Sequence, residues 1–338
     1  MDSIGWGILG PGRIARSFAT DLALVPDARL VATGSRSLER ATGFAAEFGG
    51  AAHGSYEELV SDPGVDVVYV ASPHALHVEH TMLALDAGKH VLCEKPMTLE
   101  AATTEALFAA AAERGLFLME AMWMATNPLI RTLQRLLASG RYGVPRQVHA
   151  DLGFRVRADP ADRLMDPALG AGALLDMGIY PLTFAHLVLG EPESLRAVAS
   201  LSDSGIDLDV AIAGRYRGGA TAALTASMTA QSPRTATIAT DTGCFHLPRE
   251  FHAPNSATWV AHGMSGWETG EALEEEVVPD EPVIGTGYGN EVVEVHRCLR
   301  EGATSSSVVP PEQTISLMRQ LDDVRGQIGV HYASHPRL

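Results

Sequence analysis

The segment "ILGPGRIARSF" constrains the fold more than any other stretch of the chain. It joins an apolar run to a helix-like stretch, and Gly10, Gly12 and Ala15 form a G-x-G-x-x-A pattern at the junction. The first glycine permits a tight turn, the second lets a pyrophosphate approach the backbone, and the small alanine allows close helix–strand packing. A glycine-rich turn without a ligand is the alternative. We expect a dinucleotide site that uses the N–H groups at the helix start, with contacts from Gly10, Gly12, Arg13 and Ile14.

The first third of the chain alternates short apolar runs with stretches of helical periodicity. Strands that are buried on both faces and joined by helical crossovers predict an α/β fold with a parallel, doubly wound Rossmann sheet. The predicted strands are residues 4–9, 30–33, 65–71, 90–93 and 117–119, and the predicted helices are residues 13–24, 38–48, 76–87 and 99–114.

The sequence pattern changes after Pro128, where longer β-rich runs replace the alternation of short strands and helices. The turn-forming stretch "YRGGAT" lies between two of these runs, as in an antiparallel meander. The pattern predicts a C-terminal α+β domain with an open, mainly antiparallel sheet. Helices are predicted at residues 129–139 and 172–189, β-rich runs at 195–201, 208–216, 220–230 and 236–247, and a helical tail at 290–330.

A chain of 338 residues is long for one compact domain and comfortable for two. We place a dinucleotide-binding domain at residues 1–122. We place a substrate-binding and dimerisation domain at residues 123–338, with a C-terminal helix that is free to pack back on the first domain. An open sheet with one uncovered face needs a partner, so we expect a homodimer or a dimer of dimers.

The end of the second predicted strand indicates which dinucleotide binds. NAD-binding sheets place an acid there to hold the ribose hydroxyls, whereas this chain reads "ATGSRSLER". Ser35 and Arg36 occupy that place, and Arg40 follows one helical turn later. A hydroxyl and guanidinium groups suit a 2′-phosphate, so we expect NADP in preference to NAD. The alternative is that both arginines are solvated residues at a helix start.

Charge and composition exclude several classes of partner. Acidic residues outnumber basic ones 41 to 25, for a formal charge of −16, so nucleic acid is not expected. The stretch "MDSIGWGILG" carries an acid where a secretory signal carries positive charge, and we count no apolar run near the roughly 18 residues of a membrane span. The three cysteines form no C-x-x-C pair. We therefore expect a cytoplasmic protein with no disulfide framework and no membrane partner.

An apolar strand stops abruptly in "GKHVLCEKPMT", where Glu94, Lys95 and Pro96 follow Cys93. The carboxyl ends of strands face the ligand crevice in a doubly wound sheet, so Lys95 is expected where a nicotinamide lies. Glu94 can pair with a neighbouring cation, and Pro96 fixes the turn, for which a cis bond is one route. A plain surface turn is the alternative.

The stretch "GAGALLDMGIYPL" offers a second candidate for acid–base chemistry. Asp176 and Tyr180 stand at i and i+4 of a predicted helix, so both should point from one face. A phenol titrates near pH 10, but the ammonium of Lys95 would lower that pKa enough for Tyr180 to exchange a proton with a substrate hydroxyl. Whether Lys95 or Tyr180 carries the proton is left open. A tyrosine that only packs its ring in the core is the alternative.

Three histidines stand three residues apart in "SPHALHVEH". Steps of three spread them over about 120° of a helix, so they could at most pair as ligands. We therefore expect no metal site. The residues concerned are His74, His77 and His80.

These motifs together resemble the family of glucose-fructose oxidoreductase, inositol dehydrogenase and the rhizopine-catabolism proteins. The matching stretches span nearly the whole chain: "GPGRIA", "SRSLERA", "YVASPHALHVEHTMLALDAGKHVLCEKPM", "GAGALLDMGIYPL" and "EVHRCLREG…MRQLDDVRGQIG". The D-x-G-x-Y of Asp176 to Tyr180 is most similar to the branch of dimeric dihydrodiol dehydrogenases and NADP-dependent D-xylose dehydrogenases.

The resemblance implies roles for individual residues. It implies catalysis by Lys95, Tyr180 and Asp176, and substrate contacts from Trp123, Arg163, Asp176 and Tyr180. Relatives with "EA-x-W-x-R-F-x-P" carry an arginine where this chain has Ala125, so the resemblance does not identify the substrate. The cofactor contacts expected in addition to the glycine turn are Ser35, Arg36, Arg40, Ser72, Pro73, His74, His77, Glu94 and Lys95.

The expected function is hydride transfer between a nicotinamide and a CH–OH carbon of a sugar, cyclic polyol or trans-dihydrodiol. A non-catalytic NADP-binding sensor is the first alternative, although a sensor would not need both the lysine and the tyrosine of the catalytic motifs. A redox-assisted glycosidase that keeps and recycles its dinucleotide is the second.

Overall fold

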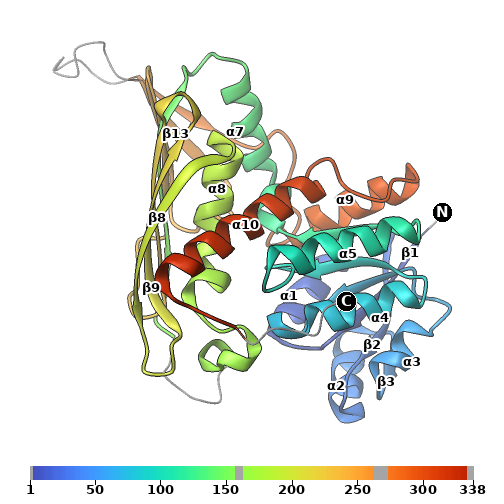
Figure 1. The fold of residues 1–338 in the computed structure, drawn as a ribbon. Coiled ribbons are helices and arrows are strands. Elements are labelled where there is room, and N and C mark those ends of the chain that lie inside the picture. Colours follow the sequence, from blue (N-terminus) through green and yellow to red (C-terminus); the bar gives the residue numbers. More distant parts are fainter. Residues whose placement is uncertain (1–2, 157–162, 262–272, 333–338) are drawn as a thin grey trace. The chain divides into compact units, whose positions relative to one another are not determined.

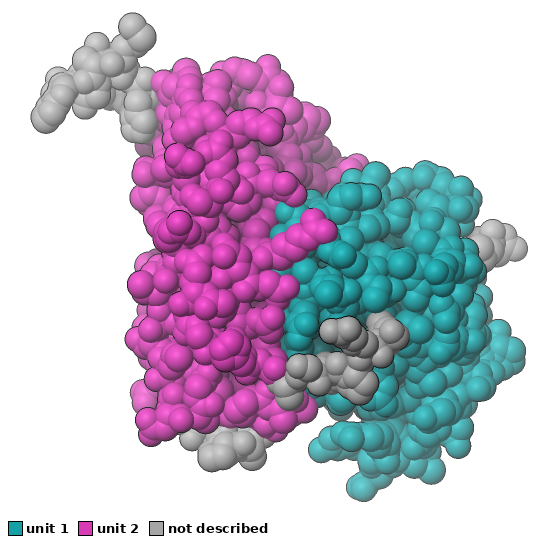
Figure 2. All heavy atoms as spheres, viewed as in Figure 1, with its two compact units in different colours: residues 1–126, 283–318, 334–338 teal, residues 127–282, 319–333 magenta. Residues whose placement is uncertain are grey.

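The computed structural model describes residues 3–156, 163–261 and 273–332, which divide into two compact units (Figure 2). Within these ranges, unit 1 comprises the residues up to 126 together with 283–318, and unit 2 comprises 127–282 together with those from 319 on. Residues 283–318, which we expected in the second domain, thus group with the first unit. The domain boundary between residues 122 and 123 stays a prediction.

Unit 1 contains a six-stranded parallel sheet in the order β3-β2-β1-β4-β5-β6. The strand order reverses between β1 and β4, which are buried along their whole length. Burial on both faces explains why these strands are continuous apolar runs, and the predicted Rossmann sheet is confirmed. The strands are β1 (Ile4–Leu9), β2 (Ala28–Gly34), β3 (Ala51–His53), β4 (Val67–Val70), β5 (His90–Glu94) and β6 (Leu118–Ala121).

Helices cover this sheet in two groups, α4 with α5 and α1 with α9 (Figure 1). Trp6 of β1 packs against Phe18 of α1, whose ring stacks 3.8 Å from Tyr69 of β4. The indole of Trp6 also donates to Nε2 of His296 at 2.9 Å, which ties α9 to the same core. The helices of this unit are α1 (Arg13–Leu22), α2 (Leu38–Phe48), α3 (Tyr56–Val60), α4 (His77–Asp86), α5 (Ala101–Glu113), α6 (Trp123–Thr126) and α9 (Tyr288–Arg300).

Unit 2 contains an eight-stranded sheet in the order β14-β13-β12-β11-β7-β10-β9-β8. Every pair is antiparallel except β7 with β10, so the prediction of an open, mainly antiparallel sheet is confirmed. The strands are β7 (Pro145–Gly153), β8 (Pro192–Leu201), β9 (Asp207–Tyr216), β10 (Thr221–Ser227), β11 (Ala236–Thr240), β12 (Gly243–Leu247), β13 (Ala257–Ala261) and β14 (Glu274–Val277).

One face of this second sheet is covered by α8 (Ile179–Leu189), which packs on β7 and β10. Strand β10 alternates between buried residues, such as Leu224, and exposed residues, such as Ala223 and Thr225. The end of α10 (Pro311–Ile328) also joins the unit, because Gln327 exchanges hydrogen bonds with the backbone of β8. Helix α7 (Pro128–Ala138) begins at a proline behind an Asn127 cap, as helix starts favour.

Several details differ from the expected elements. Strands β3, β13 and β14 and helix α3 are short and were not predicted. Residues 236–247 form the two strands β11 and β12 of a hairpin rather than one run. The expected single helix at residues 172–189 begins with a π-helical turn, Leu174–Gly178, and becomes α-helical only afterwards.

The expectation that no apolar stretch approaches the length of a membrane span was wrong for one segment. The helical stretch Pro167–Leu189 is long and apolar enough by length and composition, although 78% of its apolar 18-residue window is buried inside the protein. Such burial is what a core helix of a globular protein shows, so the segment is weak evidence for a membrane span.

Candidate active site

The turn after β1 has the features of a pyrophosphate cradle. Gly10 has a φ of +92°, a conformation that glycine adopts readily, and a Cβ there would meet the carbonyl oxygen of Ala71 at 3.3 Å. Helix α1 has no side-chain cap on its first N–H groups and no acid in its first turn, and a Cβ on Gly12 would meet open space. The neighbouring α2 is instead capped by Ser37. The uncapped N–H groups of α1 therefore fit an anion. Cofactor contact by Gly10, Gly12, Arg13 and Ile14 stays a prediction.

The loop after β2 places the residues expected at a 2′-phosphate. Ser35 is buried and its hydroxyl accepts the N–H of Ser37 at 3.2 Å, whereas Arg36 and Arg40 are exposed. The pKa of His80 is lowered to about 4, first by burial and then by the charge of Arg36. The guanidinium of Arg36 is thus close enough to His80 to disfavour its protonated form. The loop after β2 carries a cation at the place where an NAD-binding sheet would carry an acid.

The loop after β4 is held by His77 at the start of α4. Its ring is fully buried, with Nδ1 2.9 Å from the carbonyl oxygen of Pro96 and Nε2 2.9 Å from that of Ser72. His77 therefore bridges the loop after β4 and the loop after β5. His74 is also buried, in a 3-10 turn before α4, and the Ser72 hydroxyl is buried without a hydrogen-bond partner. Cofactor contact by Ser72, Pro73, His74 and His77 stays a prediction.

Two buried glutamates fix the backbone on either side of Lys95. Glu94 accepts the Lys95 N–H through Oε2 at 3.1 Å and the Tyr69 hydroxyl through Oε1. Glu120 accepts the Met97 N–H at 2.9 Å. The Lys95–Pro96 peptide is cis, one of the two forms considered from the sequence. Lys95 itself is half-buried, so the strand end presents an ammonium from a rigid main chain.

A cluster of buried acids lies behind this strand end, inside unit 1. Glu291 of α9 is fully buried and neither of its oxygens has a hydrogen-bond partner. Burial, and then the charges of Glu94 and Asp21, raise its pKa well above the ordinary value. Burial also raises the pKa of Glu120 to about 7. Burial and the neighbouring carboxyl groups therefore favour the protonated, neutral form of Glu291.

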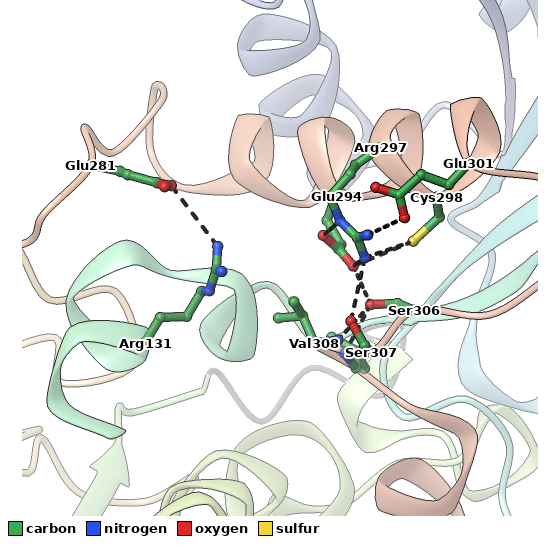
Figure 3. Close-up of polar contacts among 10 residues, drawn as sticks. Arg131, Glu281, Glu294, Arg297, Cys298, Glu301, Ser306, Ser307 and Val308 are labelled. Carbon is green, nitrogen blue, oxygen red and sulfur yellow. Dashed lines mark hydrogen bonds and ion pairs between the residues drawn. The ribbon is translucent and has the colours of Figure 1, made fainter. Parts of the chain in front are cut away.

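Helix α9 is anchored to unit 1 at both ends. At its start, Asp21 accepts the N–H groups of Thr286 and Tyr288 at 2.8 and 3.0 Å. Nearer its end, Glu294 accepts from Arg297 and from the Ser306 hydroxyl, as Figure 3 shows. Burial raises the pKa of the adjacent Cys298 thiol to about 12, which makes it a poor nucleophile. In Figure 3 the Glu294 carboxylate thus joins α9 to the segment that carries Ser306.

Unit 2 brings together two residues expected at the substrate. The Arg163 guanidinium lies 3.2 Å from Oδ1 of Asp176, which is 8% exposed. The nearby Asp166 caps a 3-10 turn by accepting the Ala168 N–H at 3.0 Å. The ion pair offers hydrogen-bonding groups of both kinds to a hydroxylated ligand.

Tyr180 lies in the first turn of α8, and its ring centroid is 5.0 Å from that of His252. His252 was not singled out from the sequence, because it follows β12 as one histidine in "REFHAPN", without a motif. The premise that Asp176 and Tyr180 share a regular α-helix was wrong, since Asp176 stands in the π-helical turn. Such turns shift the register of a helix by one residue and are frequent at functional sites.

Trp123 is nearly buried in unit 1, where its ring stacks 4.7 Å from Tyr288 of α9. Ala125, at the position where relatives carry arginine, is also buried, in α6. A substrate contact from Trp123 stays a prediction. Across the described ranges, no group of three histidine, cysteine or acidic side chains could hold a metal ion.

A parallel sheet with an uncapped glycine turn after its first strand, and a lysine held at the end of a nearby strand, defines a dinucleotide-binding oxidoreductase. Two family descriptions match the chain: "Oxidoreductase family, NAD-binding Rossmann fold" over residues 4–122, and "GFO/IDH/MocA C-terminal domain" over residues 130–246. The trans-1,2-dihydrobenzene-1,2-diol dehydrogenases of Mus musculus and Homo sapiens are each 35% identical, over 99% of this chain and 100% of their own length. The chain belongs to the GFO/IDH/MocA family and is an NAD(P)-dependent oxidoreductase.

Solved structures agree with this assignment. KijD10, a 3-ketoreductase from Actinomadura kijaniata solved with NADP and TDP-benzene, is 28% identical, with a TM-score of 0.84 over 96% of this chain and 98% of its own. Aldose-aldose oxidoreductase from Caulobacter crescentus, solved with glycerol, has a TM-score of 0.85 over 96% of this chain and 97% of its own. At 24% identity the second match shows the fold alone.

Proposed function

We propose that this protein is an NADP-preferring dehydrogenase or reductase that acts on a CH–OH carbon of a sugar, cyclic polyol or trans-dihydrodiol. The observation that carries the proposal is the rigid support of Lys95. Its N–H is held by Glu94 at the carboxyl end of β5, in a sheet whose β1 turn fits a pyrophosphate. Ligands of such sheets bind at the carboxyl ends of the strands.

NADP is the expected dinucleotide because the loop after β2 carries a buried hydroxyl and exposed guanidinium groups. Ser35, Arg36 and Arg40 would hold the 2′-phosphate, and the N–H groups of α1 would hold the pyrophosphate. The solved complex of KijD10 with NADP supports this preference.

Lys95 and Tyr180 would act as one acid–base unit in the reaction. Bound NADP(H) supplies the hydride acceptor or donor. The Lys95 ammonium would stabilise a phenolate on Tyr180, which would take the proton from the reacting hydroxyl in oxidation and return it in reduction. The Arg163–Asp176 ion pair would hold further hydroxyls of the substrate. Which of Lys95 and Tyr180 carries the proton is decided by the substitutions in the Discussion.

The substrate class follows from these polar groups and from the relatives. The curated relatives are named for trans-1,2-dihydrobenzene-1,2-diol, and KijD10 is named a 3-ketoreductase. We test the proposal by measuring NADP+ reduction with aldoses, inositols and trans-dihydrodiols. Turnover with at least one of these classes is the expected result. Tight NADPH binding without turnover of any of them would favour the sensor, and cofactor retained through gel filtration with no net turnover would favour a glycosidase.

We further propose that the protein forms a homodimer in a reducing cytoplasm. Ala223 and Thr225 lie on the exposed face of β10, and small side chains of this kind allow a second sheet to approach closely. Light scattering should give a dimer or a dimer of dimers at micromolar concentration. Thr225→Arg should shift it toward monomer, and a wild-type protein that is monomeric would contradict the proposal.

A further inference from the structure

The helix that carries Asp176 and Tyr180 begins in a stretch that cannot cap itself. Its first residues read "GAGALL", from Gly170 to Leu175, and contain no side chain with an oxygen or nitrogen. The first N–H groups of any helix lack partners within the helix, and leaving such groups buried without a partner is costly. Ala173 and Leu174 are both buried, so another part of unit 2 must supply the acceptor.

That acceptor is Asp207, the first residue of β9. Its Oδ2 accepts the Leu174 N–H at 2.6 Å, and the N–H of Ala173 is directed at the same carboxylate. Asp207 is fully buried, and its Oδ1 has no hydrogen-bond partner. Burial raises the pKa of this carboxyl to about 6, whereas the N–H groups of Leu174 and Ala173 favour its anion, as a helix N-terminus does.

The approach of this carboxylate explains one glycine of the "GAGALLD" motif. Gly172 has a φ of +131°, and a Cβ there would collide with Oδ1 of Asp207. From the other side, the hydroxyl of Tyr332 donates to the carbonyl oxygen of Ala171 at 2.9 Å. The backbone just before the π-helical turn is therefore fixed between a strand and the residues that follow α10.

We infer that Asp207 is a positioning residue, whose carboxylate fixes the first turn of the helix and thereby sets the directions of Asp176 and Tyr180. The capped residue, Leu174, is also the first residue of the π-helical turn. A π-turn and an α-turn differ by one residue in their hydrogen-bond register, so a cap at this position selects between two arrangements of the side chains that follow. The catalytic consequence of this inference rests on the proposed function of Tyr180. The hydrogen bond from Leu174 to Asp207 does not depend on that function.

The test compares Asp207→Ala and Asp207→Asn with the matched control Asp209→Asn. Asp209 lies two residues along the same strand, and its carboxylate accepts the hydroxyls of Ser227 and Thr229 instead of helix N–H groups. Hydrogen exchange, followed in a peptide that covers residues 171–178, needs no substrate. We expect exchange to quicken by about tenfold in Asp207→Ala, by less in Asp207→Asn, which keeps one oxygen, and not at all in Asp209→Asn.

The kinetic arm measures kcat and KM with NADP+ and trans-1,2-dihydrobenzene-1,2-diol, and NADPH affinity by fluorescence. Asp207→Ala should lower kcat at least tenfold, with a smaller change in KM and NADPH affinity within twofold of wild type, and Asp207→Asn should recover most of the loss. A folded Asp207→Ala with wild-type exchange and kcat overturns the inference, as does an equal loss of kcat and NADPH affinity. If Asp207→Ala does not fold, Asp207→Asn becomes the deciding variant. The inference is then overturned if hydrogen exchange and kcat of Asp207→Asn equal those of Asp209→Asn.

Tyr180→Phe, measured in parallel, separates this inference from the proposed function. Full activity in Tyr180→Phe refutes the role proposed for the phenol, whatever Asp207 does. An inactive Tyr180→Phe beside a fully active Asp207→Ala refutes only the positioning role of Asp207.

Discussion

The hydroxyl of Tyr69 donates a hydrogen bond to Oε1 of Glu94 inside unit 1, and both side chains are buried. The other oxygen of Glu94 accepts the N–H of Lys95. A buried carboxylate is tolerated only when its oxygens receive hydrogen bonds, so the phenol supports the same group that holds the Lys95 main chain. The strand end that presents Lys95 is thus braced from within the sheet.

Tyr69→Phe should lower the free energy of unfolding by about 1–3 kcal/mol, because a buried carboxylate oxygen loses one donor. The aromatic ring that stacks on Phe18 is kept. Tyr142→Phe is the matched control, since its hydroxyl also donates to a carboxylate, that of Glu275, whose side chain is 38% exposed and accessible to water. Denaturant unfolding should show a clearly smaller loss in the control. Equal losses in the two variants would argue against a special role for the buried pair.

Glu291→Gln should become more stable relative to wild type as the pH rises. Burial raises the pKa of Glu291 above its ordinary value of 4.5, so the folded protein keeps a proton that the unfolded chain releases. The contribution of such a group to stability is therefore fully present below pH 4.5 and is lost as the pH rises toward the folded pKa.

The measurement is urea unfolding of both proteins between pH 4 and pH 8. The glutamine has the shape of the protonated acid but does not titrate, so the difference in unfolding free energy should move in its favour as the pH rises. A difference that is constant with pH would mean that Glu291 titrates normally in the folded protein.

Arg36→Ala should remove most of the preference for NADPH over NADH. A guanidinium–phosphate contact is a charge-assisted hydrogen bond, whose loss corresponds to about a tenfold or greater weakening of NADPH binding. Arg29→Ala is the control, because Arg29 is an exposed arginine at the opposite end of the same strand, β2. Fluorescence titration should show unchanged NADH affinity in both variants. Equal affinities for the two dinucleotides in wild type would contradict the assignment of Arg36.

The features that the sequence predicted well are those whose physical cause is local. The turn from Gly10 to Ala15 needs particular residues at neighbouring positions, so a stretch of eleven residues is enough to predict it. The fully buried strands β1 and β4 are continuous apolar runs, which also predict strands. The assignment of Ser35 and Arg36 to a 2′-phosphate rests on their distance from that turn and stays a prediction.

The features that the sequence did not predict depend on residues far apart in the chain. Glu291 and Asp21 come close to each other only because α9 packs against α1. The residues around either acid in the sequence do not predict this contact. The π-helical turn depends on Asp207, which follows Leu174 by 33 residues. His252 has the same character, since only the folded unit 2 brings it to Tyr180. A local sign was available at Asp21, an acid directly before the apolar Leu22 of α1.

The last prediction concerns Lys95 and Tyr180 as one acid–base unit. If Lys95 lowers the pKa of the phenol, Tyr180→Phe should remove the proton acceptor and lower kcat by about a hundredfold or more, while NADPH affinity stays near wild type. Lys95→Ala should cost at least as much, because it removes both the charge that tunes the phenol and a donor to the substrate hydroxyl. Groups that act as a unit give losses that do not add, so the double variant should resemble the worse single variant. Losses that multiply would show independent roles, and near-normal turnover in Tyr180→Phe would identify Lys95 as the proton carrier.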